Sequence, residues 1–274
     1  MTKKVKRPSK TGLRFSEKAH RYWLDGKPVP GVTTILGVLN KPALVKWSAG
    51  MVAEWVADNP DGVETLRQMG REPMINALKA VPWDKRDKAA DRGSQFHLYA
   101  QQLLEGEDVE LDADDELLPV IENALRFLDE WEIEPILVEA PVASREHWYA
   151  GTADIFAKYK HPVTGHQGVA IFDWKTSRGI YPEYAMQLNA YAFADFAGLG
   201  DDIKPVPECD AAFGLHLRAD GYDVHAMKFG PDIHAEFVTI RETADIKKRM
   251  DGNWRQPGSG YVGVPIRSEV PDVA

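Results

Sequence analysis

The chain has 274 residues, of which 44% are hydrophobic and 27% are charged, as is usual for a soluble globular protein. No apolar run approaches the roughly 18 residues that cross a bilayer, and no apolar stretch follows the basic residues after Met1. We therefore expect no association with a membrane and no secretory signal. The single cysteine, Cys209, excludes a disulfide framework and a cysteine-ligated iron–sulfur cluster, and it predicts a cytoplasmic protein.

Charge is spread unevenly along the chain. The formal net charge is −9, yet residues 1–50 hold eleven Lys and Arg against two acidic residues, whereas residues 101–140 hold fourteen Asp and Glu against Arg126 alone. Such a field would steer a polyanion to one face and repel it from the other. A solvated basic tail and an acidic helix would give the same counts, so both interpretations stay open.

The N-terminal part predicts a tail and then a hairpin. Residues 1–12 have the composition of a disordered basic tail, and residues 13–83 are predicted to form an N-terminal hairpin and helical region. Two alternating segments, 13–24 and 29–34, flank Asp25-Gly26, which is a strong hairpin signal. Aromatic and basic side chains interleave in this hairpin. That pattern suits single-strand binding by stacking and phosphate contact, or simply packing onto the core.

Helices are expected to complete this region. Residues 32–36 lead into a helix, and residues 42–57 form another, with an apolar stripe made of Leu44, Trp47, Met51 and Trp55. Residues 63–80 predict a further helix, interrupted by Pro73. The segment Val81-Pro82-Trp83-Asp84 is expected to break that helix.

Residues 84–250 are predicted to form an α/β core with a small mixed sheet flanked by helices, and residues 251–274 a C-terminal tail. The first core helix, 84–105, places His97 beside an apolar stripe. A lone histidine in such a position is usually structural. An acidic loop follows, in which Asp114 is expected to cap a helix whose apolar face is Leu117, Ile121, Leu125, Leu128 and Trp131.

The predicted core strands carry isolated acidic residues. Strand 135–143 contains Glu139, which suits either an accessory acidic residue of a site or an exposed edge position. Segments 149–159 and 169–174, joined by a loop with Pro and Gly, predict a hairpin whose strands hold Asp154 and Asp173.

Lys175 follows Asp173 by two residues, so the two side chains share a face of the strand. A buried carboxylate is costly unless it is paired or binds a metal, and Mg²⁺ prefers oxygen ligands. Asp154, Asp173 and Lys175 therefore predict a site for a divalent cation. A structural Asp–Lys ion pair is the alternative.

The remaining segments predict a helix, a hairpin and a final helix. Pro182 is expected to open a helix that extends to about Phe196, on which Gln187 and Tyr191 share a face because they are four residues apart. Residues 210–218 and 222–229 predict the hairpin, and residues 236–250 the last helix.

The candidate phosphate contacts are Thr176, Ser177 and Arg178. The chain has no G-x-x-x-x-G-K-[ST] loop, so no helicase or ATPase motor is expected.

In this order, the motifs resemble the RecB-like, lambda-exonuclease-like branch of the PD-(D/E)xK nuclease superfamily. The matching segments are Gly151-Thr152-Ala153-Asp154, Asp173-Trp174-Lys175 and Gln187-Leu188-Asn189-Ala190-Tyr191, with the upstream histidine of Arg92-Gly93-Ser94-Gln95-Phe96-His97. The segment Pro30-Gly31-Val32-Thr33-Thr34 also resembles phage-encoded members. The resemblance implies that residues 84–250 are a RecB-like nuclease core with the restriction-endonuclease-like fold.

The resemblance also implies an activity: a Mg²⁺- or Mn²⁺-dependent DNA exonuclease of phage replication or recombination. The implied metal ligands are His97, Asp154, Asp173 and the backbone carbonyl of Trp174, with Glu139 as an accessory residue. Lys175 would position or activate the attacking water, and Gln187 and Tyr191 would hold the DNA strand.

The expected partners are DNA and a single-strand annealing or replication protein, in the host cytoplasm. The alternatives are a structure- or site-specific endonuclease, a catalytically inactive DNA-binding accessory protein, and an interaction protein in which the Asp and Lys residues form a buried ion pair.

Overall fold

The structure is a computed structural model that describes residues 12–16, 18–39, 41–112, 115–200, 202–252 and 259–262. All of the predicted basic tail except Gly12 lies outside the described residues. So do the predicted cap Asp114 and most of the predicted C-terminal tail.

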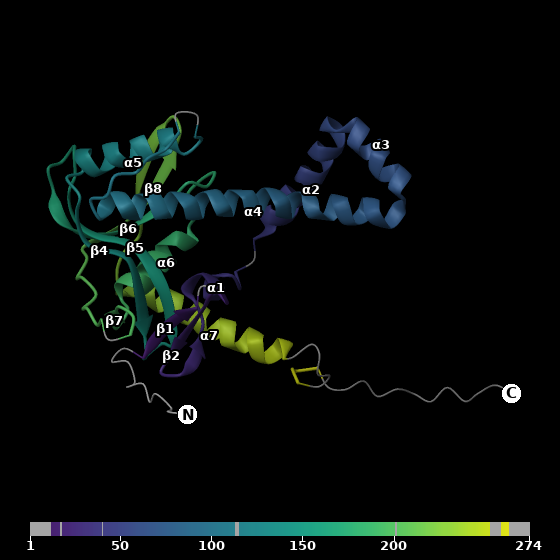
Figure 1. Cartoon of the computed structure of the whole chain (residues 1–274). Helices are drawn as coiled ribbons and strands as arrows, with labels where there is room; N and C mark the ends of the chain where they lie inside the picture. Colours follow the sequence, from purple (N-terminus) through teal and green to yellow (C-terminus); the bar gives the residue numbers. More distant parts are fainter. Residues whose placement is uncertain are drawn as a thin grey trace, which may run out of the picture.

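A six-stranded mixed sheet forms the centre of the molecule, with the strand order β7-β4-β5-β6-β8-β9 (Figure 1). Its members are β4 (Glu134–Ser144), β5 (Tyr149–Lys160), β6 (Gln167–Lys175), β7 (Phe196–Ala197), β8 (Ala211–Arg218) and β9 (Gly221–Ala226). Only β6 and β8 pair in parallel; the other neighbours are antiparallel. The predicted α/β class, the mixed sheet and the β5–β6 hairpin are confirmed.

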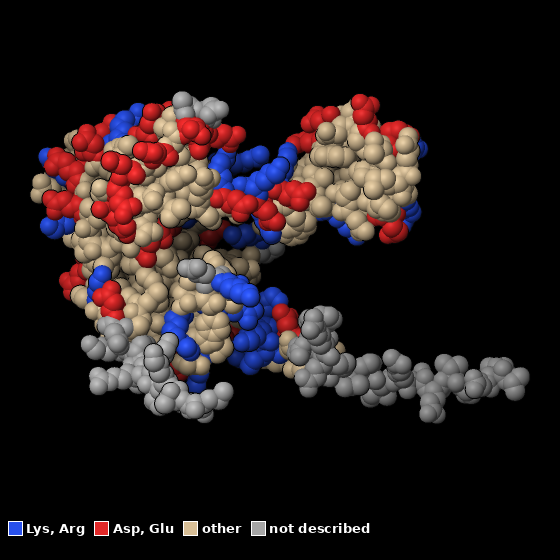
Figure 2. All heavy atoms as spheres, viewed as in Figure 1, with Lys and Arg blue, Asp and Glu red and all other residues tan. Residues whose placement is uncertain are grey.

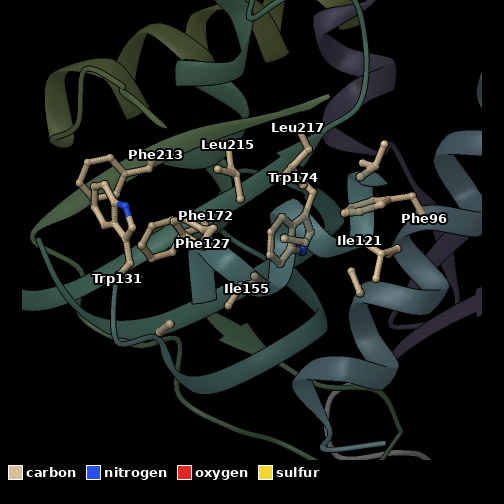
Figure 3. Close-up of a cluster of buried hydrophobic side chains, with 14 of the residues drawn as sticks. Phe96, Ile121, Phe127, Trp131, Ile155, Phe172, Trp174, Phe213, Leu215 and Leu217 are labelled. Atoms are coloured by element: carbon tan, nitrogen blue, oxygen red, sulfur yellow. The ribbon is translucent and has the colours of Figure 1, made fainter. Parts of the chain in front are cut away.

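Helices cover both faces of this sheet. On one face, α4 (Arg71–Leu104) and α5 (Leu118–Glu130) enclose an aromatic cluster with β5, β6 and β8. Figure 3 shows its side chains, among them Phe96, Phe127 and Trp174. On the other face, α6 (Glu183–Ala192) and α7 (Pro231–Asp251) enclose a second cluster that includes Leu188 and Phe237.

The N-terminal residues form a separate three-stranded sheet of β1 (Leu13–Ser16), β2 (Arg21–Leu24) and β3 (Lys27–Val29). The predicted turn is confirmed: Asp25 and Gly26 have φ values of 50° and 79°, as a two-residue hairpin turn with both φ positive requires. The strand segment expected over 29–34 ends at Val29, and the helix expected at 32–36 is confirmed as α1 (Val32–Leu36), which buries Val32 and Ile35.

Two helices, α2 (Pro42–Asp58) and α3 (Pro60–Met69), stand apart from the sheet at the N-terminal end of α4 (Figure 1). The break expected at 81–84 was wrong, because α4 continues through Pro82 for a total of 34 residues. Pro82 lacks the backbone N–H that a helix interior uses, yet it is buried and lines a groove with Leu44 and Val52 of α2. Leu44, expected within the apolar stripe, is 55% exposed.

Three further expectations need correction. The apolar face predicted for α5 is confirmed at Leu117, Ile121 and Trp131, which are buried, but Leu125 is 46% exposed, and Val120 and Ala124 are buried as well. The helix expected to reach Phe196 ends at Ala192, and Phe196 pairs with Ala143 as part of β7. Helix α7 begins at Pro231, ahead of the expected Glu236.

The surface reflects the uneven charge. In Figure 2, acidic side chains cover the lobe that carries α5, and basic side chains gather where α1 and α7 lie. Within the part of the chain that the structure describes, no helix has both the length and the apolar character needed to cross a bilayer.

Gly151 is required by close packing between β5 and α6. A Cβ atom at this position would lie 2.4 Å from Cε1 of Tyr191, whose ring is buried. We expect Gly151→Ala to lower the free energy of unfolding by roughly 1–3 kcal/mol, as overpacking of a core does. Urea denaturation measures the difference.

Gly50→Ala is the matched control, since nothing lies within 4 Å of a Cβ atom at this position in α2. Alanine has the higher helix propensity, so this variant should gain about 0.5–1 kcal/mol. Equal stability of the two variants would contradict the packing argument.

Candidate metal and catalytic site

The candidate site lies where β5 and β6 separate. Their pairing ends at Ile155 and Phe172, so Asp154 and Asp173 are the first residues beyond the ladder. Beyond the last backbone pair, the Asp154 side chain replaces a backbone carbonyl as acceptor: its Oδ2 accepts a hydrogen bond of 2.8 Å from the Trp174 N–H. This bond links the two strands at the point where they diverge.

An irregularity in β4 and β5 turns two carboxylates toward α4. Side chains of a regular strand alternate between faces, yet Ala153 and Phe156, three residues apart, pack in the same cluster. Glu139 lies between Val138 and Ala140, which pair with Ile155 and Ala153, and it has a φ of 43°, which a non-glycine residue rarely adopts. The alternation therefore breaks at Glu139 and Asp154.

Helix α4 brings His97 to these carboxylates. Phe96 packs edge-on against Trp174 with ring centroids 5.8 Å apart, which holds this turn of α4 against β6. The Nδ1 atom of His97 then lies 3.1 Å from Glu139 Oε1 and 3.7 Å from Asp154 Oδ1. The structure thus joins His97 to Asp154, as expected, and places Glu139 in the site rather than at an exposed edge.

Asp173 has a different set of partners on the α6 side of the sheet. Its Oδ2 forms an ion pair with the Lys175 ammonium, and its Oδ1 accepts a hydrogen bond of 3.0 Å from Gln187 Nε2. Lys175 also lies over the Tyr184 ring, with Nζ 4.6 Å from the centroid. Asp173, Lys175 and Gln187 therefore form one network, in which Asp173 and Gln187 are buried and Lys175 is partly exposed.

Burial and mutual charge set the protonation of the site. Burial disfavours the charged form of His97, but Asp154 and Glu139 outweigh it and raise the pKa of His97 to about 9. Burial raises the pKa of Asp173 to about 6, against the opposing charge of Lys175. Burial also disfavours the Lys175 charge, yet Asp173 and Asp154 raise the pKa of Lys175, so it is an ammonium at neutral pH.

Three side chains of this site could together hold a metal ion. One ligand atom each from His97, Glu139 and Asp154 lies within 4.8 Å of the others. An imidazole and two carboxylates suit Mn²⁺ as well as Mg²⁺. Asp173 is outside this group, and its role as a ligand, like that of the Trp174 carbonyl, stays a prediction.

The residues predicted to touch substrate fall into two sets. Gln187 and Tyr191 share a face of α6 as expected, but both are buried, at 8% and 4% exposure. Ser177 and Arg178 are exposed and Thr176 partly so, in the loop after Lys175. The phosphate contacts of this loop stay a prediction. The role of Gln187 and Tyr191 in holding a DNA strand also stays a prediction.

Sequence reasoning missed two tyrosines. Tyr184 is three residues before Gln187 on α6, so helical spacing places it on the same face and would have found it. Tyr22 of β2 forms a hydrogen bond of 2.7 Å with Thr152, two residues before Asp154. This contact spans 130 residues of sequence, and no local pattern indicates it.

Comparison with known proteins adds no family assignment. No family model matches the chain, and no curated protein matches it significantly.

Glu139 tests whether the three-residue group binds metal. We expect Mn²⁺ to raise the melting temperature of the protein, because an ion that binds only the folded state stabilises it. Glu139→Gln removes one anionic ligand of the group, and the Mn²⁺ affinity should fall by at least about tenfold. Thermal denaturation at several Mn²⁺ concentrations measures both effects.

Glu134→Gln in the same strand is the control, since Glu134 is exposed and pairs with Lys158. This variant should keep the Mn²⁺ affinity of the parent protein. An unchanged affinity in Glu139→Gln would remove Glu139 from the ligand set.

Proposed function

We propose that the chain is a metal-dependent deoxyribonuclease that hydrolyses phosphodiester bonds and acts as an exonuclease. The observation that carries this proposal is the convergence of His97, Glu139 and Asp154 beside the ion pair of Asp173 and Lys175. The order of the motifs, which resembles RecB-like nucleases, supports DNA as the substrate and attack from an end.

Each residue has a distinct task in the proposed reaction. His97, Glu139 and Asp154 would hold a divalent cation, which when bound lowers the pKa of a water and neutralises charge on the phosphate. Lys175, as an ammonium held by Asp173, orients the attacking water and stabilises negative charge that develops on the phosphate. Gln187 fixes the Asp173 carboxylate from α6. The raised pKa of Lys175 favours this electrostatic role over proton abstraction.

The shape and charge of the surface are consistent with a polyanionic substrate. Figure 2 shows a hollow beneath α4, with Lys and Arg side chains beside it and the acidic α5 lobe turned outward. A substrate steered by this field would approach the basic side rather than the acidic lobe.

Variants of Lys175 and Asp173 test the proposed catalytic roles separately from folding and metal binding. We expect Lys175→Ala and Asp173→Ala each to reduce cleavage at least about a hundredfold, because charge-stabilising and proton-handling groups contribute on that scale. The measurement is the cleavage rate of end-labelled DNA with Mg²⁺. Lys175→Ala should keep the Mn²⁺-dependent rise in melting temperature, since Lys175 is not in the ligand group.

Lys158→Ala is the matched control, because this exposed lysine of β5 pairs only with Glu134 among the described residues. It should cleave DNA at the rate of the parent protein. Full activity of Lys175→Ala would refute the assigned role.

Linear and circular DNA distinguish the possible modes of action. End-labelled linear DNA should be shortened from its ends with Mg²⁺ or Mn²⁺ and left intact with EDTA, while closed circular DNA should survive, since an exonuclease needs an end. Cleavage of the circle would instead identify an endonuclease. If the protein binds linear DNA but does not cleave it in the presence of Mg²⁺ or Mn²⁺, it is an accessory DNA-binding protein.

A further inference from the structure

A second group of metal-ligating side chains lies on the hairpin of β8 and β9, outside the candidate nuclease site. One ligand atom each from His216, Asp223 and His225 lies within 4.8 Å of the others. The register pairs His216 directly with Asp223, and His225 follows Asp223 by two residues, so all three share one face of the hairpin.

The hydrogen bond of His216 sets which ring nitrogen is free to bind a cation. Its Nε2 lies 2.7 Å from the carbonyl oxygen of Ser177. A carbonyl oxygen only accepts, so Nε2 carries the proton and Nδ1 keeps its lone pair in the neutral ring. Histidines that bind metals commonly donate the other N–H to a carbonyl in this way. The Nδ1 atom faces Arg218 and Asp223.

A positive group already lies between two of the three ligands. The Nη1 atom of Arg218 is 3.1 Å from His216 Nδ1 and 2.7 Å from Asp223 Oδ2. The guanidinium therefore shows that this point on the hairpin attracts a cation. Arg218 also has a second partner, Asp220, with Nε 3.1 Å from its Oδ1, which can keep the side chain paired when it leaves Asp223.

We propose that His216, Asp223 and His225 bind a transition-metal dication of the Zn²⁺ type, which displaces Arg218 toward Asp220. Two imidazoles and one carboxylate favour such an ion over Mg²⁺ or Ca²⁺, which prefer oxygen ligands alone. The metal would join Asp223 to His216, and His216 is hydrogen-bonded to the carbonyl of Ser177, two residues after Lys175. It therefore braces the loop that follows the Asp173-Trp174-Lys175 motif.

The experiment is calorimetric titration of the full chain with Zn²⁺, in a background of His97→Ala and Asp154→Ala that removes two of the three ligands of the first site. One Zn²⁺ should bind per chain. His225→Ala, at an exposed position, should weaken binding at least about tenfold, whereas Arg218→Ala should strengthen it by removing the competing cation.

His166→Ala is the matched control, because His166 is an exposed histidine in the turn between β5 and β6. It should leave Zn²⁺ binding unchanged. Absence of Zn²⁺ binding in the background protein, or equal binding with and without His225, would overturn the proposal and leave Arg218 as a structural bridge. Since the background lacks two ligands of the first site, this outcome is independent of nuclease activity.

Discussion

Two carboxylates buried in one sheet impose the main constraint on this structure. Asp154 and Asp173 are 8% and 1% exposed, and each must recover the hydration energy that it loses. The fold solves the problem differently for each one. Asp154 receives the Trp174 N–H and the nearby His97, whereas Asp173 receives Lys175 and Gln187. The separation of β5 and β6, and the buried glutamine of α6, follow from this division.

Trp174 couples the site to the core. Its side chain packs among aromatic rings, with Phe96 and Phe127 at centroid distances of 5.8 Å and 5.9 Å, while its backbone N–H is bound to Asp154. Its chain neighbours are Asp173 and Lys175, and the neighbour of Phe96 is His97. The packing of one aromatic cluster therefore sets the distance between α4 and β6, and with it the geometry of the site (Figure 3). Rigid packing of this kind keeps polar groups in place without further contacts.

Local chemistry accounts for what the sequence could predict. The β5–β6 hairpin and the Asp25-Gly26 turn follow from strand periodicity and turn preference, and both are present. Tertiary contacts account for the errors. Pro82 stays inside a helix at a buried position beside a groove that α2 also lines, and Phe196 joins a strand because β4 offers an edge. Glu139 reaches the site through a positive φ, and no pattern in its own segment indicates that conformation.

The balance of charge favours a metal site over the simple ion pair. A structural pair needs only Asp173 and Lys175, and these two residues already neutralise each other. Glu139 and Asp154 then remain as two carboxyl groups beside His97. A protonated imidazole compensates only one of them, although the two carboxylates raise its pKa to about 9. A divalent cation bound by a neutral imidazole would compensate both carboxylates. It would replace the single positive charge of the proton with two, at a site where burial makes each uncompensated charge costly.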